Sequence, residues 1–192
     1  MEKGKDFYNN AYQNGGYKNM YRKHYSTSPY FKVWNKAIEI IKTIDNPAMI
    51  EIGCGVGQFA QMLFDHHYTQ YKGIDFSDTA ISLAQTRNPL FQKNFSIDDA
   101  YTSSIYEEHY NLVILFEVLE HLQQDLPVLA NIKKGVKVIF SVPNFDSASH
   151  VRHFQSKEHV FERYRNELHI NQIHPIKIST RNTIYLGDGQ KR

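Results

Sequence analysis

Cysteine is almost absent from this sequence, because Cys54 is the only one among 192 residues. A single cysteine cannot form an internal disulfide, which excludes a disulfide-stapled secreted scaffold and favours a reducing compartment. Long apolar runs are also missing, since no stretch reaches the roughly 20 residues that a membrane-spanning helix needs. The opening sequence Met-Glu-Lys-Gly-Lys-Asp has no apolar segment behind it of the kind that signal peptides carry. We therefore expect a cytoplasmic protein with no membrane partner.

A strong excess of charge of either sign is missing as well. Lys and Arg number 22 and Asp and Glu number 20, which gives a formal net charge of +2 with neutral histidines. This balance is far from the basic surface with which proteins coat nucleic acid, so a nucleic-acid partner is not expected. With 41% hydrophobic and 22% charged residues, the chain has the composition of one globular domain.

Short apolar segments alternate with segments of helical periodicity over most of the chain. Strands are predicted at residues 48–52, 71–75, 95–97, 110–116 and 136–142, and helices at 33–44, 58–65 and 77–84. This alternation predicts an α/β fold with a mostly parallel, doubly wound sheet that carries helices on both faces. Residues 169–178 and 183–186 are two further strand patterns with no helix between them. We expect these two to form an antiparallel pair.

Aromatic residues are concentrated before the first predicted strand, over residues 5–31. We interpret residues 1–45 as an aromatic-rich lid with a helix, and residues 46–192 as the core of the same domain. An ordinary surface-packed extension is the alternative for the aromatic stretch. The candidate lid contacts are Tyr12, Tyr17, Tyr21, His24 and Tyr25.

A glycine-rich loop lies where the first predicted strand meets the following helix. Its pattern is Glu51-x-Gly53-x-Gly55-x-Gly57, and glycines allow a sharp turn and close approach of the backbone to a ligand. The third glycine comes one residue earlier than in the Gly-x-Gly-x-x-Gly loop that binds dinucleotides, which weighs against a pyrophosphate. Asp75 ends the next strand, about 20 residues further on, where a carboxylate can accept hydrogen bonds from both ribose hydroxyls of an adenosine.

Five short motifs follow one another along the chain from the glycine loop onward. They are Ile-Glu-Ile-Gly-Cys-Gly-Val-Gly at 50–57, Gly-Ile-Asp-Phe-Ser at 73–77, Asp-Ala at 99–100, Leu-Phe-Glu-Val-Leu-Glu-His-Leu at 115–122 and Ser-Val-Pro-Asn at 141–144. Together they span roughly residues 48–145 and resemble the class I S-adenosylmethionine-dependent methyltransferases. The resemblance implies a seven-stranded sheet whose last strand inserts antiparallel, in agreement with the strand pair expected near the C-terminus.

The same resemblance implies which residues bind S-adenosyl-L-methionine. The methionine part would face the glycine loop, with Glu51, Gly53, Cys54, Gly55 and Gly57. The ribose would face Asp75, at the end of a strand. The adenine would face Phe76, Asp99 and Ala100, and the sulfonium would face Phe116, at the end of the fourth strand. Methyl transfer then requires that the acceptor is aligned and water excluded.

Two acids and a histidine follow the fourth strand in the pattern Glu117-x-x-Glu120-His121. If the stretch is helical, these positions share one face, at the sheet edge where open α/β sheets bind ligands. Such a set suits a divalent cation such as Mg²⁺ or Mn²⁺, and similar motifs bind metal in some ubiquinone-pathway and small-RNA O-methyltransferases. In family members without metal, the acids cap a helix and the histidine faces the acceptor. His150 and His153, after the fifth strand, could supply a further ligand or a base.

The net charge near zero and the lack of an inserted recognition domain predict a methyltransferase that acts on a small polar metabolite. A domain of this kind with this N-terminal segment resembles methyltransferases that modify sugars or surface-polysaccharide precursors, and this resemblance implies an O-methyltransferase of such an acceptor. An alcohol acceptor must lose its proton, for which a base or a metal is useful. The candidate catalytic residues are His24, His121, His150 and His153. An RNA or protein methyltransferase is an alternative. From other classes, a nucleotide-dependent oxidoreductase or epimerase and a non-catalytic cofactor-binding subunit stay open.

Overall fold

Five parallel strands form most of the sheet in the computed structural model, which describes residues 1–192. The strands are β1 (Met49–Ile52), β2 (Tyr71–Asp75), β3 (Phe95–Ile97), β4 (Leu112–Phe116), β5 (Lys137–Pro143), β6 (Leu168–Lys177) and β7 (Thr183–Lys191). Their order is β3-β2-β1-β4-β5-β7-β6, and β7 runs antiparallel to both β5 and β6. The seven-stranded sheet with an antiparallel C-terminal pair is therefore confirmed.

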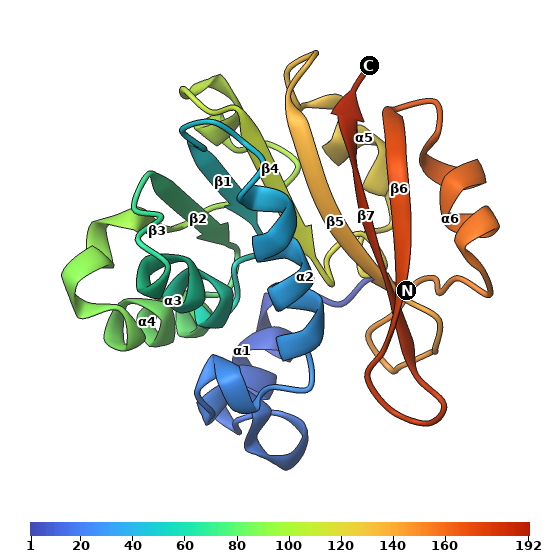
Figure 1. Cartoon of the computed structure of the whole chain (residues 1–192). Helices are drawn as coiled ribbons and strands as arrows, with labels where there is room; N and C mark the ends of the chain where they lie inside the picture. The colour runs from blue at the N-terminus through green and yellow to red at the C-terminus, as the bar shows by residue number, and fades with distance from the viewer.

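Helices cover both faces of this sheet, as predicted (Figure 1). The α-helices are α1 (Lys5–Gln13), α2 (Phe31–Ile41), α3 (Gln58–Asp65), α4 (Asp78–Arg87), α5 (Asp125–Ala130) and α6 (Lys157–Tyr164). Short 3-10 helices lie at η1 (Tyr17–Arg22), η2 (Tyr25–Thr27), η3 (Pro89–Asn94) and η4 (Ser104–Glu107). Crossing a bilayer would take a longer and more apolar helix than any of these.

The central strand β4 connects the two halves of the hydrophobic core. Its Val113 and Leu115 point to the cluster that α5 and α6 complete. Ile114 and Phe116 point to the opposite cluster, which contains the buried faces of α2, α3 and α4. This two-sided burial explains why the strand is apolar at every position, as parallel strands between helix layers are. The core thereby holds the carboxyl ends of β1, β2 and β4 in fixed relative positions.

The last strand is longer than its sequence pattern predicts, since β7 continues to Lys191 rather than ending at Leu186. The extension contains Gly187 and Gly189, which weaken a strand pattern. Both glycines are needed where they lie. A Cβ at Gly187 would come within 2.4 Å of the Phe140 ring, and one at Gly189 within 2.6 Å of the His169 carbonyl oxygen.

Candidate cofactor and acceptor site

The glycine loop between β1 and α3 follows a backbone path that disfavours side chains. Gly53 has φ of +71°, and a Cβ there would lie 2.5 Å from Val118 Cγ2. Gly57, with φ of +68°, immediately precedes α3. Gly55 has φ of +53°, and its missing Cβ would face the Tyr12 hydroxyl at 3.5 Å. The loop therefore exposes bare backbone, and the free N–H groups of a helix start, toward the N-terminal segment.

Asp75, at the end of β2, is a buried carboxylate with two backbone partners. Its Oδ2 accepts a hydrogen bond from the Gly55 N–H at 3.0 Å, and its Oδ1 accepts one from the Ser77 N–H at 2.9 Å. Burial raises the pKa of Asp75 to about 6, and the two N–H donors limit this rise. Asp75 is thus mainly ionised at neutral pH and retains lone pairs for two further hydroxyl donors.

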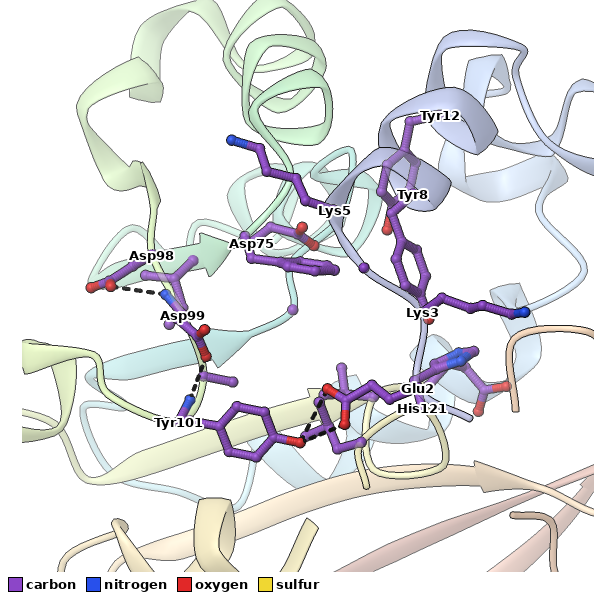
Figure 2. Close-up of a pocket in the computed structure, with 18 residues that line it drawn as sticks. Glu2, Lys3, Lys5, Tyr8, Tyr12, Asp75, Asp98, Asp99, Tyr101 and His121 are labelled. Atoms are coloured by element: carbon purple, nitrogen blue, oxygen red, sulfur yellow. Dashed lines mark hydrogen bonds between the residues drawn. The ribbon is translucent and has the colours of Figure 1, made fainter. Parts of the chain in front are cut away.

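A cavity of about 380 Å³ opens beside Asp75, and we call it the β2 cavity. Its floor and walls include Phe76, Ala100 and Tyr101. Figure 2 shows Glu2 and Tyr8 of the N-terminal segment on the side opposite Asp98 and Asp99. The full lining is Glu2–Lys5, Tyr8, Tyr12, Gly53, Ile74–Phe76, Asp98–Tyr101, Glu117, Val118, His121 and Leu122.

A second cavity of about 490 Å³, the aromatic cavity, lies on the other side of Gly53. Both cavities share Tyr8, Tyr12, Gly53, Glu117 and His121 as lining residues, so they adjoin at this point. The remaining wall of the aromatic cavity comes from the segment before α2, from α2, β1, the glycine loop, α3 and β4, and from the loop after β5. Its residues are Phe7, Ala11, Gly16, Tyr17, Met20, Tyr21, Tyr30, Trp34, Glu51, Cys54–Val56, Gln58, Phe59, Phe116, Phe145 and Ser147–His150.

Residues 1–27, which we call the lid, close over the two cavities through polar contacts at both ends. At the α1 end, the partners are Glu2 with Tyr101 at 2.9 Å, Lys5 with Asp78 at 2.9 Å, and Asn9 with Ser77 at 2.5 Å. At the η1 end, Gln58 Nε2 donates to the carbonyls of Met20 and Lys23. Arg87 donates to those of Tyr21 and Lys23. The lid is thus fixed to the β2–α4 region and to the start of α3.

The segment after β4 is a turn and not a helix, so the prediction that Glu117, Glu120 and His121 share a helical face is wrong. Glu117 has φ of +55°, which is outside the helical region. Its Oε1 accepts a hydrogen bond from Ser141 Oγ at 2.8 Å, on the neighbouring strand β5. Glu117 therefore bonds to β5 and lines both cavities beside His121, but it is not part of the three-residue grouping that Glu120 and His121 join.

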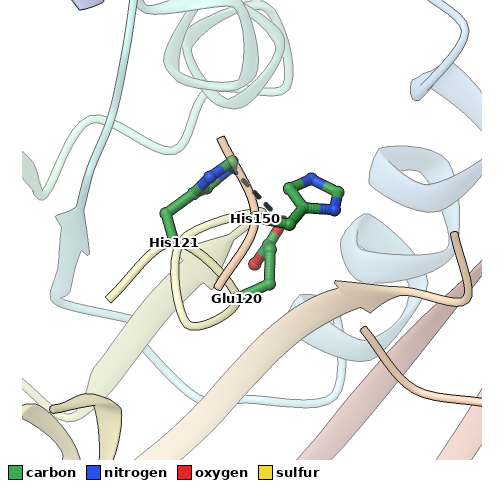
Figure 3. Close-up of side chains that lie close together, drawn as sticks. All are labelled: Glu120, His121 and His150. Atoms are coloured by element: carbon green, nitrogen blue, oxygen red, sulfur yellow. Dashed lines mark ion pairs between the residues drawn. The ribbon is translucent and has the colours of Figure 1, made fainter. Parts of the chain in front are cut away.

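Glu120, His121 and His150 bring one ligand atom each to within 4.8 Å of one another (Figure 3). His121 Nδ1 lies 3.0 Å from the Ser149 carbonyl, and His150 Nδ1 lies 3.0 Å from the Phe145 carbonyl. A carbonyl can only accept, so each Nδ1 carries the proton and each Nε2 keeps its lone pair. Glu120 is fully buried, and neither carboxylate oxygen has a hydrogen-bond partner. These residues form a convergent set of electron-pair donors.

Burial decides the charge of the ionisable groups around the junction of the cavities. It raises the pKa of Glu51 to about 8, that of Glu117 to about 7, and that of Glu120 well above its ordinary value. It lowers the pKa of His121 to about 4 and that of His150 as well. Both imidazoles are therefore neutral at pH 7, as ligands or bases must be.

The structure brings most of the predicted site residues to the two cavities. Asp75, Phe76, Asp99 and Ala100 line the β2 cavity, and Glu51, Gly53, Cys54, Gly55, Phe116, His121 and His150 line the aromatic cavity. Gly57 lies behind them at the start of α3. His24 and His153 are exposed and line neither cavity. His24 instead caps η2, accepting from the Ser26 N–H at 3.3 Å.

Tyr8 is the most prominent site residue that the sequence analysis did not select. Its ring lies edge-on to Phe76 at 5.3 Å and to His121 at 5.8 Å, and it lines both cavities. Its buried hydroxyl has no hydrogen-bond partner. Tyr8 is one of many lid aromatics, and its selection depends on how α1 lies across the sheet edge, which no local pattern encodes.

Comparisons with known proteins agree with this architecture. The sequence matches the family model described as "Methyltransferase domain" over residues 28–176. No curated protein matches the sequence. Magnesium protoporphyrin IX methyltransferase from Synechocystis PCC 6803, solved with bound SAH, superposes with a TM-score of 0.75 at 14% identity, over 98% of each chain.

Two other solved structures show the same fold at low identity. The N-methyltransferase NodS from Bradyrhizobium japonicum has a TM-score of 0.68 at 18% identity, over 85% of this chain and 87% of its own. The [4+2]-cyclase SpnF has a TM-score of 0.70 at 12% identity, over 83% and 80%. The family match covers most of the sequence, including the glycine loop, Asp75 and the residues after β4. The chain therefore belongs to the methyltransferase-domain family and has the fold of the class I S-adenosylmethionine-dependent methyltransferases.

Proposed function

We propose that this protein methylates a hydroxyl group of a small polar acceptor, such as a sugar or a surface-polysaccharide precursor, with S-adenosyl-L-methionine in the cytoplasm. One observation carries the proposal: two cavities of different character adjoin at Gly53, Glu117 and His121. The first holds the ionised Asp75 beside Phe76, and the second is enclosed by aromatic side chains. This pairing suits a nucleoside on one side and an acceptor on the other.

The residues present fit the cofactor. Asp75 would accept hydrogen bonds from the ribose hydroxyls, Phe76 would pack against adenine, and the bare backbone at Gly55 would lie against the methionine part. S-adenosyl-L-methionine supplies a methyl group that its sulfonium has already activated. The protein must then align the acceptor and exclude water, and the lid with its contacts from Lys5 to Asp78 and from Gln58 serves the second purpose.

The acceptor's proton is the remaining requirement, and Glu120, His121 and His150 lie where it would leave. As a base, His121 is weak because burial lowers its pKa to about 4. As neutral ligands, His121 and His150 are held by Nδ1–H bonds to carbonyls, which is the usual support of metal-binding imidazoles. The unpartnered Glu120 carboxylate would complete the set.

We therefore assign Glu120, His121 and His150, without Glu117, as candidate ligands of a divalent cation. Two imidazole nitrogens suit Mn²⁺ better than Mg²⁺, which prefers oxygen ligands. A cation at this point would lower the pKa of an acceptor hydroxyl, so that O-methylation needs no strong base.

The test is transfer of radiolabelled methyl from S-adenosyl-L-methionine to a metabolite panel, before and after chelation. We expect chelation to reduce turnover by about 100-fold or more and Mn²⁺ to restore it. His150→Ala should lose activity and calorimetric Mn²⁺ binding together, whereas the exposed His153→Ala should keep both. If chelation has no effect but His121→Ala is inactive, His121 acts as a base and the assignment of a metal site is wrong. If neither change matters, alignment alone accounts for the reaction.

A further inference from the structure

The aromatic cavity contains no lysine or arginine among its lining residues. Its walls are formed largely by rings, among them Tyr30, Trp34, Phe116 and Phe145. The only basic side chains that reach it are the imidazoles of His121 and His150. The cavity therefore offers no permanently charged cation to a ligand.

The cationic side chains around the aromatic cavity lie outside its lining. Lys3 lines the β2 cavity, with its Nζ 5.6 Å from the centre of the Phe7 ring. Arg87 donates to three backbone carbonyls, and Lys5 forms its ion pair with Asp78 at 2.9 Å, beside the β2 cavity. Lys18 lies outside the lining, with its Nζ 5.2 Å from the centre of the Tyr17 ring at the cavity wall. An anionic group bound inside the aromatic cavity would therefore meet no lysine or arginine among the residues that line it.

The acidic groups at this cavity supply no positive charge either. Glu51 and Glu117 line the aromatic cavity, and Glu120 lies behind it. A phosphate or carboxylate that entered would lose its hydration without gaining a counterion, which is costly in a closed site. A divalent cation bound by Glu120, His121 and His150 would itself be a counterion at the edge of this cavity, so the binding measurements below are made with a chelator present and compare the protein's own side chains.

We infer that the reacting end of the acceptor carries no phosphate or carboxylate and presents a flat, weakly polar face to the rings. An unphosphorylated sugar ring or a phenol meets this description, whereas a sugar phosphate or the backbone of a nucleic acid does not. Sugar C–H groups and aromatic rings both pack on Tyr, Trp and Phe. The inference rests on the proposed function, because it names the substrate class of the same site.

Trp34 makes the inference measurable, because it is the only tryptophan in the chain and lines the aromatic cavity. Its fluorescence is titrated, with S-adenosylhomocysteine present, against 4-nitrophenyl β-D-glucopyranoside and against 4-nitrophenyl phosphate. Both probes carry the nitrophenyl quenching group, which is joined to a neutral sugar ring in one and to a charged phosphate in the other. We expect the glucoside to quench saturably and the phosphate to need at least about tenfold higher concentration. The same order should hold in Lys18→Ala.

A matched pair of variants tests whether the lack of a positive charge in the aromatic cavity causes the weak binding of the phosphate. Ser147 is exposed at the cavity wall, so Ser147→Lys adds a cation with little structural cost, and Ser147→Gln is its neutral control. Ser147→Lys should bind 4-nitrophenyl phosphate about tenfold more tightly than wild type does, whereas Ser147→Gln should bind it as wild type does. The inference would be overturned if Lys18→Ala bound the phosphate as tightly as the glucoside or more tightly. It would also be overturned if the glucoside did not quench the fluorescence. Calorimetry with S-adenosylhomocysteine separates the two failures, since loss of cofactor binding would contradict the proposed function itself.

Discussion

The buried acids of the β2 cavity and of the aromatic cavity differ in what their carboxylates touch. Asp75 accepts from two backbone N–H groups, and its pKa of about 6 leaves it mainly ionised at neutral pH. Glu51 has one hydroxyl partner, Tyr71, at 2.5 Å, and its pKa rises to about 8. Glu117 likewise has the Ser141 hydroxyl, and its pKa rises to about 7.

Burial raises all three pKa values, and the hydrogen-bond donors then limit the rise at each carboxylate. N–H groups of a loop and a helix start are fixed and cannot turn away, whereas hydroxyl groups can both donate and accept. The β2 cavity therefore keeps one ionised carboxylate for a polar ligand. The aromatic cavity keeps Glu51 mostly neutral, and its rings then dominate recognition. The predictions below test the two sides of this contrast.

The largest expected effect is on the β2 side, with Asp75→Ala. Hydrogen bonds to a charged group contribute roughly 1.5–3 kcal/mol each, so losing two should weaken S-adenosylhomocysteine binding by about 100-fold or more. Asp75→Asn keeps one oxygen acceptor and should lose less. Asp45→Asn, at an exposed residue that lines neither cavity, is the control and should bind normally. Calorimetry that finds unchanged affinity in Asp75→Ala would remove Asp75 from the cofactor site.

The strands and several residues that line the β2 cavity could be predicted because their signals are local. The apolar run of β4 and the glycines from Gly53 to Gly57 lie within a few residues of one another, and Asp75 ends an evident strand. Helix α6 was not predicted, since it buries only Val160 and Tyr164 and is otherwise polar. The end of β7 was also missed, because its glycines are required by neighbouring strands that a local pattern does not contain.

The cluster of Glu120, His121 and His150 depends on contacts between distant segments. His150 meets Glu120 because the chain after β5 returns, with the Val151 N–H donating to the Glu120 carbonyl at 2.8 Å. The turn at Glu117 follows from its bond to Ser141 on the next strand, not from the residues around it. His24 and His153 have suitable chemistry, but nothing in their spacing shows that they lie on the surface.

A smaller effect is expected from Arg152, which positions the turn that carries Glu120 and His121. Arg152 donates to the carbonyls of Leu119 and Leu122, at 2.5 and 2.6 Å, and lies 3.2 Å from the buried Asp125. Arg152→Gln should lower kcat by about tenfold, because the turn relaxes, and should leave S-adenosylhomocysteine affinity within about twofold. Arg152→Lys should recover little, since lysine lacks the planar fork.

The control for Arg152 is Arg165→Gln, which breaks only an exposed pair with Glu162. It should leave both kcat and cofactor affinity unchanged. A merely structural role of Arg152 would reduce cofactor affinity together with kcat, so equal losses in both constants would count against a positioning role.

The smallest expected effect concerns the neutral acid of the aromatic cavity, Glu51, and the pH dependence of stability. Its folded pKa of about 8 lies above the ordinary 4.5, so the folded protein binds this proton more tightly than the unfolded chain does. The contribution of Glu51 is therefore fully present below about pH 4.5 and is lost as the pH rises toward about 8.

Glu51→Gln keeps a partner for Tyr71 and removes the titration. Between about pH 6.5 and 7.5, wild type should lose on the order of 1 kcal/mol of unfolding free energy more than the variant. Urea unfolding at a series of pH values measures this difference, with the exposed Glu39→Gln as control. Parallel curves for wild type and Glu51→Gln would mean that Glu51 is ionised in the folded protein, and the contrast between the two cavities would then fail on its aromatic side.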